Sequence, residues 1–158
     1  MSKLLLSGIL IALAAGSFPD RLCSCQKALQ DDRPHGANET VEYPDKTVKR
    51  ITGRVSYSFN GAPAEDVVVE IYEITPADTK LKTHEITQRK VRRAACITSN
   101  DGSFCFTNLP SGRYLLRAGP RSSRGMNEVF MKVNLDRSWW SRWFRSGRDI
   151  ELGLTLGT

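Results

Sequence analysis

Aromatic and basic side chains are concentrated in one stretch near the C-terminal end of the 158-residue chain. Residues 137–148 hold all three tryptophans and four arginines. Aromatic faces stack on sugars or bases, and arginines bind anionic groups, so this stretch has the composition of a binding loop. Amphipathic clusters of tryptophan and arginine also settle at membrane interfaces. The candidate ligand-binding residues are Trp139, Trp140, Arg142, Trp143 and Arg145.

A structural role is the alternative for the same tryptophans. Three exposed tryptophans side by side would form a patch that promotes aggregation of a monomer. They can instead fold back over an open end of the domain while the arginines reach into solvent. The sequence leaves binding and capping both open.

The charge of the chain favours anionic partners. The formal net charge is +6, and residues 117–148 contain eight basic side chains against two acidic ones. Such a basic stripe suits an anionic surface of lipid or polysaccharide. The chain has no motif of a nucleic-acid-binding fold, so no nucleic-acid partner is expected.

The residue types that usually carry catalysis form no recognisable motif. The two histidines, His35 and His84, do not belong to a cluster with the spacing of metal ligands. The chain contains no nucleophile elbow, no phosphate-binding glycine loop and no His-Glu-x-x-His sequence. Glu65 and Asp66 are adjacent carboxylates beside a turn, where solvated charges are the simplest interpretation. We therefore expect no catalytic residue, no metal and no cofactor.

The N-terminus has the pattern of a signal peptide. Lys3 precedes an apolar run at 4–16 that ends in small residues, and we expect cleavage near Gly16. The run is shorter than the roughly 20 apolar residues that span a bilayer, so no transmembrane anchor is expected. Residues 17–49 are polar and rich in turn formers, which predicts a linker or disordered arm. The protein is thus expected to be secreted or periplasmic.

From residue 50 onward, apolar and polar side chains alternate with the period of half-buried β-strands. The charged segment 80–93 predicts an exposed edge hairpin, with a helix as the alternative. The pattern predicts one all-β sandwich domain over residues 50–158, built from about seven strands. Apart from the charged segment, the predicted strands lie near 51–59, 67–74, 96–98, 103–106, 113–118, 129–135 and 150–156.

An exported protein meets an oxidising compartment, where cysteines tend to pair. Cys96 and Cys105 flank the sequence Asn-Asp-Gly, which predicts a hairpin turn. If residues 99–102 form its loop, the two cysteines lie opposite each other within reach of a disulfide. For Cys23 and Cys25 three outcomes stay open: a bond to each other, a bond to another chain, or removal with a longer leader.

Several short motifs in this order resemble the carboxypeptidase regulatory-like domain family. The family pattern runs from a Gly-x-Val strand through a Gly-x-Pro turn and an Asp-Gly-x-Phe hairpin to Leu-Pro-x-Gly-x-Tyr. The matching positions span about residues 50–118. The resemblance implies a transthyretin-like (prealbumin-like), seven-stranded sandwich of the Greek-key type. The matching residues are Gly53, Gly61, Pro63, Asp101, Gly102, Phe104, Leu109, Pro110, Gly112 and Tyr114.

The motif residues also have physical roles in folding. Gly102 permits the positive φ of the hairpin turn. Pro110 and Gly112 set a turn that brings Tyr114 inward, where its hydroxyl is expected to bond to nearby backbone as in a tyrosine corner. We therefore interpret these residues as structural.

The expected function is that of an exported, non-catalytic module with a structural or interaction role. Its partner would be a protein or polysaccharide outside the cytoplasm. The first alternative is a carbohydrate- or envelope-binding module that acts through residues 139–143. The second is a transthyretin-like hydrolase, since similar folds include hydroxyisourate hydrolases. Those enzymes end in Tyr-Arg-Gly-Ser, whereas this chain ends in Thr-Leu-Gly-Thr and lacks their early histidine.

Overall fold

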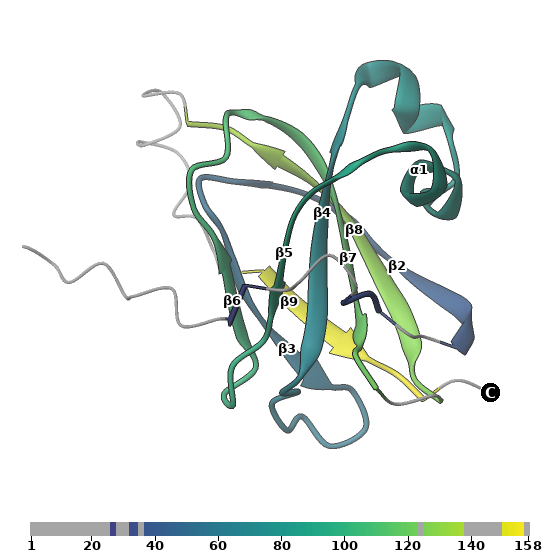
Figure 1. Ribbon diagram of the computed structural model, residues 1–158, viewed down its shortest axis with the longest axis vertical. Helices are drawn as coiled ribbons and strands as arrows, with labels where there is room; N and C mark the ends of the chain where they lie inside the picture. Colours follow the sequence, from purple (N-terminus) through teal and green to yellow (C-terminus); the bar gives the residue numbers. More distant parts are fainter. Residues whose placement is uncertain (1–25, 28–31, 35–36, 123–124, 138–149, 157–158) are drawn as a thin grey trace, which may run out of the picture.

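The computed structural model describes residues 26–27, 32–34, 37–122, 125–137 and 150–156. Over these residues the chain is mostly β, and two sheets pack in an open, sandwich-like arrangement with one α-helix beside them (Figure 1). The described elements are β1 (Gln26–Lys27), β2 (Ala37–Val48), β3 (Ile51–Tyr57), β4 (Val67–Ile74), the 3-10 helix η1 (Pro76–Lys80), α1 (Thr83–Arg89), β5 (Arg92–Ile97), β6 (Ser103–Phe106), β7 (Gly112–Pro120), β8 (Asn127–Leu135) and β9 (Ile150–Leu154).

The larger sheet has six strands in the order β1-β5-β4-β7-β8-β2, and the smaller has three in the order β6-β3-β9. Most pairs are antiparallel, but β2 runs parallel to β8 and β3 runs parallel to β9. The described residues thus contain nine strands rather than about seven. The two additional strands, β1 and β2, both come before residue 50.

The expectation of a linker or disordered arm over residues 17–49 is wrong for Ala37–Val48, which forms β2. Its polar composition suits an edge strand with one face on the core. Val41 and Tyr43 pack against the core, and the Gly153 amide of β9 donates to the Tyr43 hydroxyl at 2.8 Å. Pro44 is tolerated because it falls at a register shift on a sheet edge.

One apolar core fills the space between the two sheets. Val55 of β3, Tyr114 and Leu116 of β7 and Leu152 of β9 are among its buried members. The predicted central strand β4 is buried on both faces, since only Glu73 of its eight residues is exposed. The larger sheet therefore needs a cover on its outer face as well.

Part of that cover comes from residues 80–93, for which the expected edge hairpin is wrong and the helical alternative is confirmed. Ile86 of α1 is fully buried and packs on Tyr72, Leu115 and Phe130 of the larger sheet. This apolar contact explains why the segment forms a helix beside the sheet instead of extending its edge. Strand β5 begins only at Arg92.

The prediction that residues 99–102 join two paired strands of one hairpin is wrong, although the turn is present. The turn itself forms, because the Gly102 amide donates to the Ser99 carbonyl at 2.7 Å and Gly102 has a φ of 74°. However, β5 belongs to the larger sheet and β6 to the smaller one. The chain crosses from one sheet to the other at this turn.

Gly53 provides a test of the close packing in the smaller sheet. A Cβ at this position would overlap the backbone oxygen of Ile150 and lie 2.8 Å from Cζ of Phe104. We expect Gly53→Ala to lower the free energy of unfolding by about 3 kcal/mol in urea titrations. Gly61→Ala is the control, because a Cβ there meets nothing within 4 Å and only the φ of 69° opposes it, at about 1 kcal/mol. Equal losses would contradict the packing described.

Asp78 of η1 provides a test of how the segment that covers the larger sheet is held in place, because it pairs with Lys90 at the end of α1. Hydrogen bonds from Lys90 and Thr75 lower the pKa of Asp78 from 3.8 to about 2. Its stabilising contribution is therefore complete above pH 3.8 and is lost as the pH falls toward about 2. We expect the melting temperature of Asp78→Asn, followed by circular dichroism, to fall less steeply over this range than that of the wild type. Parallel curves would show that the contacts of Asp78 do not stabilise the fold.

Candidate functional site

The predicted ligand-binding residues Trp139, Trp140, Arg142, Trp143 and Arg145 lie outside the described residues. The described chain shows where this stretch is attached. β8 ends at Leu135 and β9 begins at Ile150, beside the start of β3, where Gly53 pairs with Ile150. The Asp136 amide donates to the Val48 carbonyl at 2.9 Å, so the end of β8 also lies beside the end of β2.

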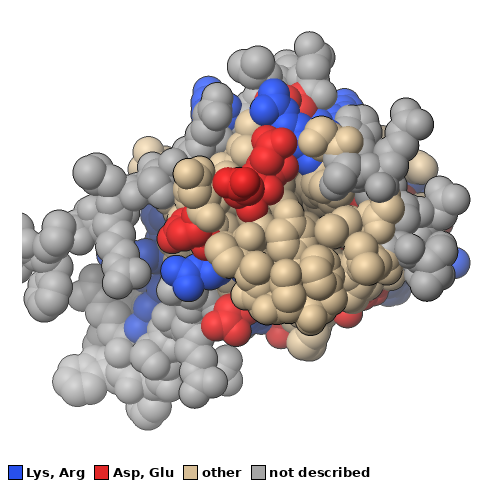
Figure 2. Space-filling model, turned by 90° about the horizontal axis from the view of Figure 1, so that it is seen from below, with Lys and Arg blue, Asp and Glu red and all other residues tan. Residues whose placement is uncertain are grey.

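Basic side chains surround this attachment point, which we call the basic end. The described residues here include the exposed Arg50, Arg93, Arg113 and Arg137 and the half-buried Lys49, against the acidic Glu73 and Asp136. The opposite end of the sandwich has a broad uncharged surface (Figure 2). The two ends therefore differ in charge, and the field of the described residues at the basic end attracts anionic groups.

The motif residues that carry the family resemblance occupy structural positions. The Tyr114 side chain is fully buried, and its hydroxyl donates to the Pro110 carbonyl at 2.8 Å, which is the geometry of a tyrosine corner. Burial raises the pKa of Tyr114, so the hydroxyl remains a donor at neutral pH. Phe104 and Leu109 are buried in the same core, and Gly61 and Gly102 have positive φ. Pro63 forms a β-bridge with Ser56.

Asp101 and Gly112 complete these turns. The Asp101 carboxylate accepts hydrogen bonds from the Ser99 hydroxyl at 2.8 Å and the Ser103 amide at 3.1 Å. Hydrogen bonds from Ser103 and Ser99 lower the pKa of Asp101 to about 2. Gly112 lies beside the Tyr114 ring, because a Cβ there would be 3.8 Å from the hydroxyl oxygen. Asp101 and Gly112 therefore both have a structural role in their turns.

The disulfide predicted between Cys96 and Cys105 is wrong, because Cys96 is a buried thiol. Cys96 points into the core from the larger sheet. Phe104 and Phe106 pack on the core from the smaller sheet, so Cys105 between them faces the outer side. The Cys96 side chain thus points into the core from the larger sheet, whereas the Cys105 side chain points away from the core on the smaller sheet. In a two-stranded hairpin the two side chains would have lain on the same face. Cys23 and Cys25 lie outside the described residues.

A network of buried and half-buried ionisable residues lies on the outer face of the larger sheet, and we call it the Glu70 cluster. The side chain of Glu70 is fully buried. One of its oxygens accepts from Arg92 at 3.0 Å, and the other accepts from Arg117 at 3.2 Å and from the Tyr72 hydroxyl at 2.8 Å. Arg117 also forms a two-point pair with Glu128, at 2.8 and 2.7 Å. Such two-point pairs are the strongest geometry for these groups.

Within the cluster, the pKa values of Tyr72 and Arg117 are both raised. Burial, the charge of Glu70 and the hydrogen bond to Glu70 raise the pKa of Tyr72 to about 12. Burial opposes the charge of Arg117, but the hydrogen bond and charge of Glu128 together with the charge of Glu70 outweigh it and raise the pKa. At neutral pH Tyr72 is therefore a neutral donor and Arg117 a permanent cation.

A β-bulge places the Arg92 side chain on the same face of the sheet as Glu70. Cys96 of β5 faces the core, whereas its neighbour Ile97 faces the outer side. Strict alternation would therefore send Arg92 inward with Cys96. The pairing of β4 with β5 shifts between Ala94 and Arg92, which leaves one extra residue and returns Arg92 to the outer face.

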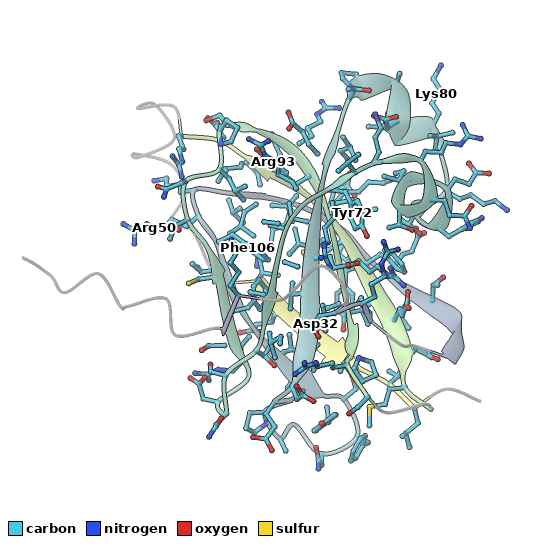
Figure 3. All side chains as sticks on the ribbon, viewed as in Figure 1. Asp32, Arg50, Tyr72, Lys80, Arg93 and Phe106 are labelled. Atoms are coloured by element: carbon cyan, nitrogen blue, oxygen red, sulfur yellow. The ribbon has the colours of Figure 1, made fainter. Side chains whose placement is uncertain are left out.

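The N-terminal residues 32–34 lie against the Glu70 cluster. Arg92 donates to the Asp32 carbonyl at 2.6 Å, and the Asp32 carboxylate accepts from Arg121 at 2.9 Å. A Cβ on Gly119 of β7 would be 2.8 Å from Pro34, so this glycine gives Pro34 room to pack on the sheet. Tyr72 and Asp32, both labelled in Figure 3, lie over the middle of the larger sheet.

The Glu70 cluster has the geometry of a structural anchor. Its carboxylates and guanidinium groups form ion pairs with one another. Sequence reasoning missed the cluster, although a glutamate inside the apolar run of β4 was a signal for a buried charge that needs partners. Within the described ranges, no group of three or more His, Cys, Asp or Glu side chains could hold a metal ion.

Comparisons with known proteins give no relative: no protein-family model and no curated sequence matches the chain. In the part of the chain that the structure describes, no helix has the length and apolar composition required to cross a membrane.

Removing one charge from the cluster tests its contribution to stability. Glu70→Gln leaves the half-buried Arg92 and Arg117 without their shared counter-charge, and we expect a loss of about 3 kcal/mol in the free energy of unfolding. The control is Arg54→Ala, which breaks the 3.6 Å pair with Asp101 between side chains that are 60% and 59% exposed. That variant should change stability by less than about 0.5 kcal/mol in the same chemical denaturation. A loss in Glu70→Gln no larger than in the control would contradict the anchor.

Proposed function

We propose that this chain is an exported β-sandwich module of the carboxypeptidase regulatory-like, transthyretin-like kind, with a structural or interaction role and no bond chemistry of its own. The observation that carries the proposal is the role of the motif residues. The tyrosine corner at Tyr114 and the turn at Gly102 hold the sandwich together, as the resemblance implies. The Glu70 cluster supports it as well, because its charged groups serve the fold rather than a substrate.

The strand count is compatible with this proposal. Strands β3 to β9 number seven and extend over residues 51–154. They correspond in number to the seven-stranded Greek-key sandwich of the family. β1 and β2 are then additions at the two edges of the larger sheet.

Export is supported by two features. The first is the signal-peptide pattern of residues 1–16. The second is Cys105, which is disulfide-bonded. Structural disulfides persist in oxidising compartments and are rare in the cytosol of mesophilic cells.

A carbohydrate- or envelope-binding module is the second candidate. The basic end favours it, because Arg50, Arg93, Arg113 and Arg137 are exposed there, and the three tryptophans follow Arg137 in the sequence. Arginines attract phosphate or carboxylate groups, and tryptophans stack on sugar rings or settle at a lipid interface. Anionic polysaccharide and anionic lipid share this chemistry.

Peptide mapping of the exported protein tests the proposed compartment. We expect a mature chain that begins near residue 17, with Cys96 alkylated only after unfolding. Digestion without reduction should recover Cys105 in a disulfide-linked peptide, and the sequence of that peptide identifies its partner. Retention of residues 1–16 in the cytoplasmic fraction would contradict export. A reduced Cys105 in the extracytoplasmic fraction would contradict the disulfide.

Pull-down on anionic vesicles and on acidic polysaccharide separates the two candidate functions. If the tryptophan stretch binds, Trp140→Ala and Arg113→Glu should each lower retention at least about fivefold. Val91→Ala is the control, because it shortens an exposed apolar side chain beside α1 that belongs to neither end of the sandwich. Equal retention of wild type and all variants would reject the envelope-binding candidate and leave the structural or protein-interaction role.

A further inference from the structure

Exposed apolar side chains gather at the end of the sandwich opposite the basic end, and we call this the apolar end. Phe59 and Leu156 are 58% and 59% exposed. Tyr57 and Met126 are partly buried beneath them and contact the core. Figure 2 shows this end as a broad uncharged surface with carboxylates along its side.

Three strands bring these side chains together. Tyr57 of β3 pairs with Leu154 of β9, and the amide of Ser58, just after β3, donates to the Leu154 carbonyl at 2.9 Å. Leu156 forms a bridge with Met126, just before β8. The rings of Tyr57 and Phe59 stack with their centroids 5.5 Å apart. The turn after β3, the end of β9 and the start of β8 therefore place these four side chains at the same end of the sandwich.

The exposure of Phe59 is built into a hydrogen-bonded turn. The Tyr57 carbonyl accepts from Gly61 at 2.7 Å, and the Tyr57 amide donates to the Ala62 carbonyl at 2.8 Å. The Asn60 side chain accepts from the Ala62 amide at 3.0 Å, and Gly61 supplies the positive φ. Phe59 is thus held at the tip of the turn instead of folding into the core, where a large apolar side chain would be more stable.

The rim of the apolar end is acidic. Glu65, Asp66 and Asp101 are exposed there. The two described arginines nearby are each paired with a carboxylate: Arg54 with Asp101 at 3.6 Å, and Arg121 with Asp66 at 3.5 Å. Arg121 also pairs with Asp32 at 2.9 Å. The described residues therefore leave an excess of negative charge at this end.

The two ends of one molecule are complementary. The basic end presents an excess of arginine, and the apolar end presents apolar side chains with an acidic rim. They lie at opposite ends of the same strands, so one molecule cannot join them. Contact between two apolar ends would oppose like charges, whereas contact between unlike ends would pair opposite charges and cover Phe59 and Leu156.

We propose that the apolar end binds the basic end of a second copy, so that exported molecules associate head to tail. Such a contact is heterologous and repeats, since each bound copy still presents one unused end. The association is driven by burial of Phe59 and Leu156 and is oriented by the charge difference between the ends. It does not depend on the proposed envelope binding, which concerns a different ligand.

Analytical ultracentrifugation of the mature wild-type protein tests this inference. From about 10 µM to 1 mM, the mean mass should rise beyond that of a dimer, and raising the salt from about 0.05 to 0.5 M should weaken association. The double variant Phe59→Ser, Leu156→Ser should associate at least about tenfold more weakly. Val91→Ser is the matched control, because Val91 is 89% exposed beside α1 and should not affect association.

A mixing experiment identifies the orientation. The double variant Arg113→Glu, Arg137→Glu changes the basic end only, and circular dichroism confirms that each variant folds. Each double variant alone should be monomeric, whereas an equimolar mixture should form dimers that do not extend. A wild type that stays monomeric up to 1 mM would overturn the proposal. So would a basic-end variant that still associates while the apolar-end variant does not, which would indicate a symmetric contact between apolar ends.

Discussion

The buried Glu70 carboxylate and its two arginines are the interaction on which the arrangement of the larger sheet depends. A glutamate on a central strand is compatible with folding only if its charge is compensated where it lies. Arg92 and Arg117 supply that compensation from the two strands that flank β4. Because Arg92 also binds the Asp32 carbonyl, the same contact holds residues 32–34 over the sheet.

The outer face of the larger sheet is therefore covered in two ways. Beside the charged cluster, Tyr72, Leu115 and Phe130 lie under Ile86 of α1. The other layer of the sandwich covers the inner face, so β4 is shielded from water on both sides. Beyond the covered larger sheet, the described residues present two ends of the sandwich for contacts with partners. Those ends differ in charge and in apolar content, so each end suits a different kind of contact.

Much of the fold was predictable from alternation alone. The strands at β3, β4, β7, β8 and β9 and the corner at Tyr114 follow from apolar residues with period two and from turn chemistry. β2 was not predictable, because an edge strand carries few apolar residues and its Pro44 is a disfavoured residue in a strand. The disulfide prediction failed because a turn sequence specifies its local geometry but not whether the following strand stays in the same sheet. For the Glu70 cluster, the charged residues were visible, but their partners come from strands and a bulge whose register the sequence does not reveal.

Hydrogen exchange measured by nuclear magnetic resonance tests the central claim most directly. If the larger sheet is a layer covered on both faces around Glu70, the amides of β4 and of residues 115–118 in β7 should exchange only through global unfolding. Their protection should be equal to one another and greater than that of the edge strands β2 and β9. Exchange of the β4 amides at the rate of the edge strands would contradict the account, because it would show that the outer face opens locally and that the cluster does not hold its cover.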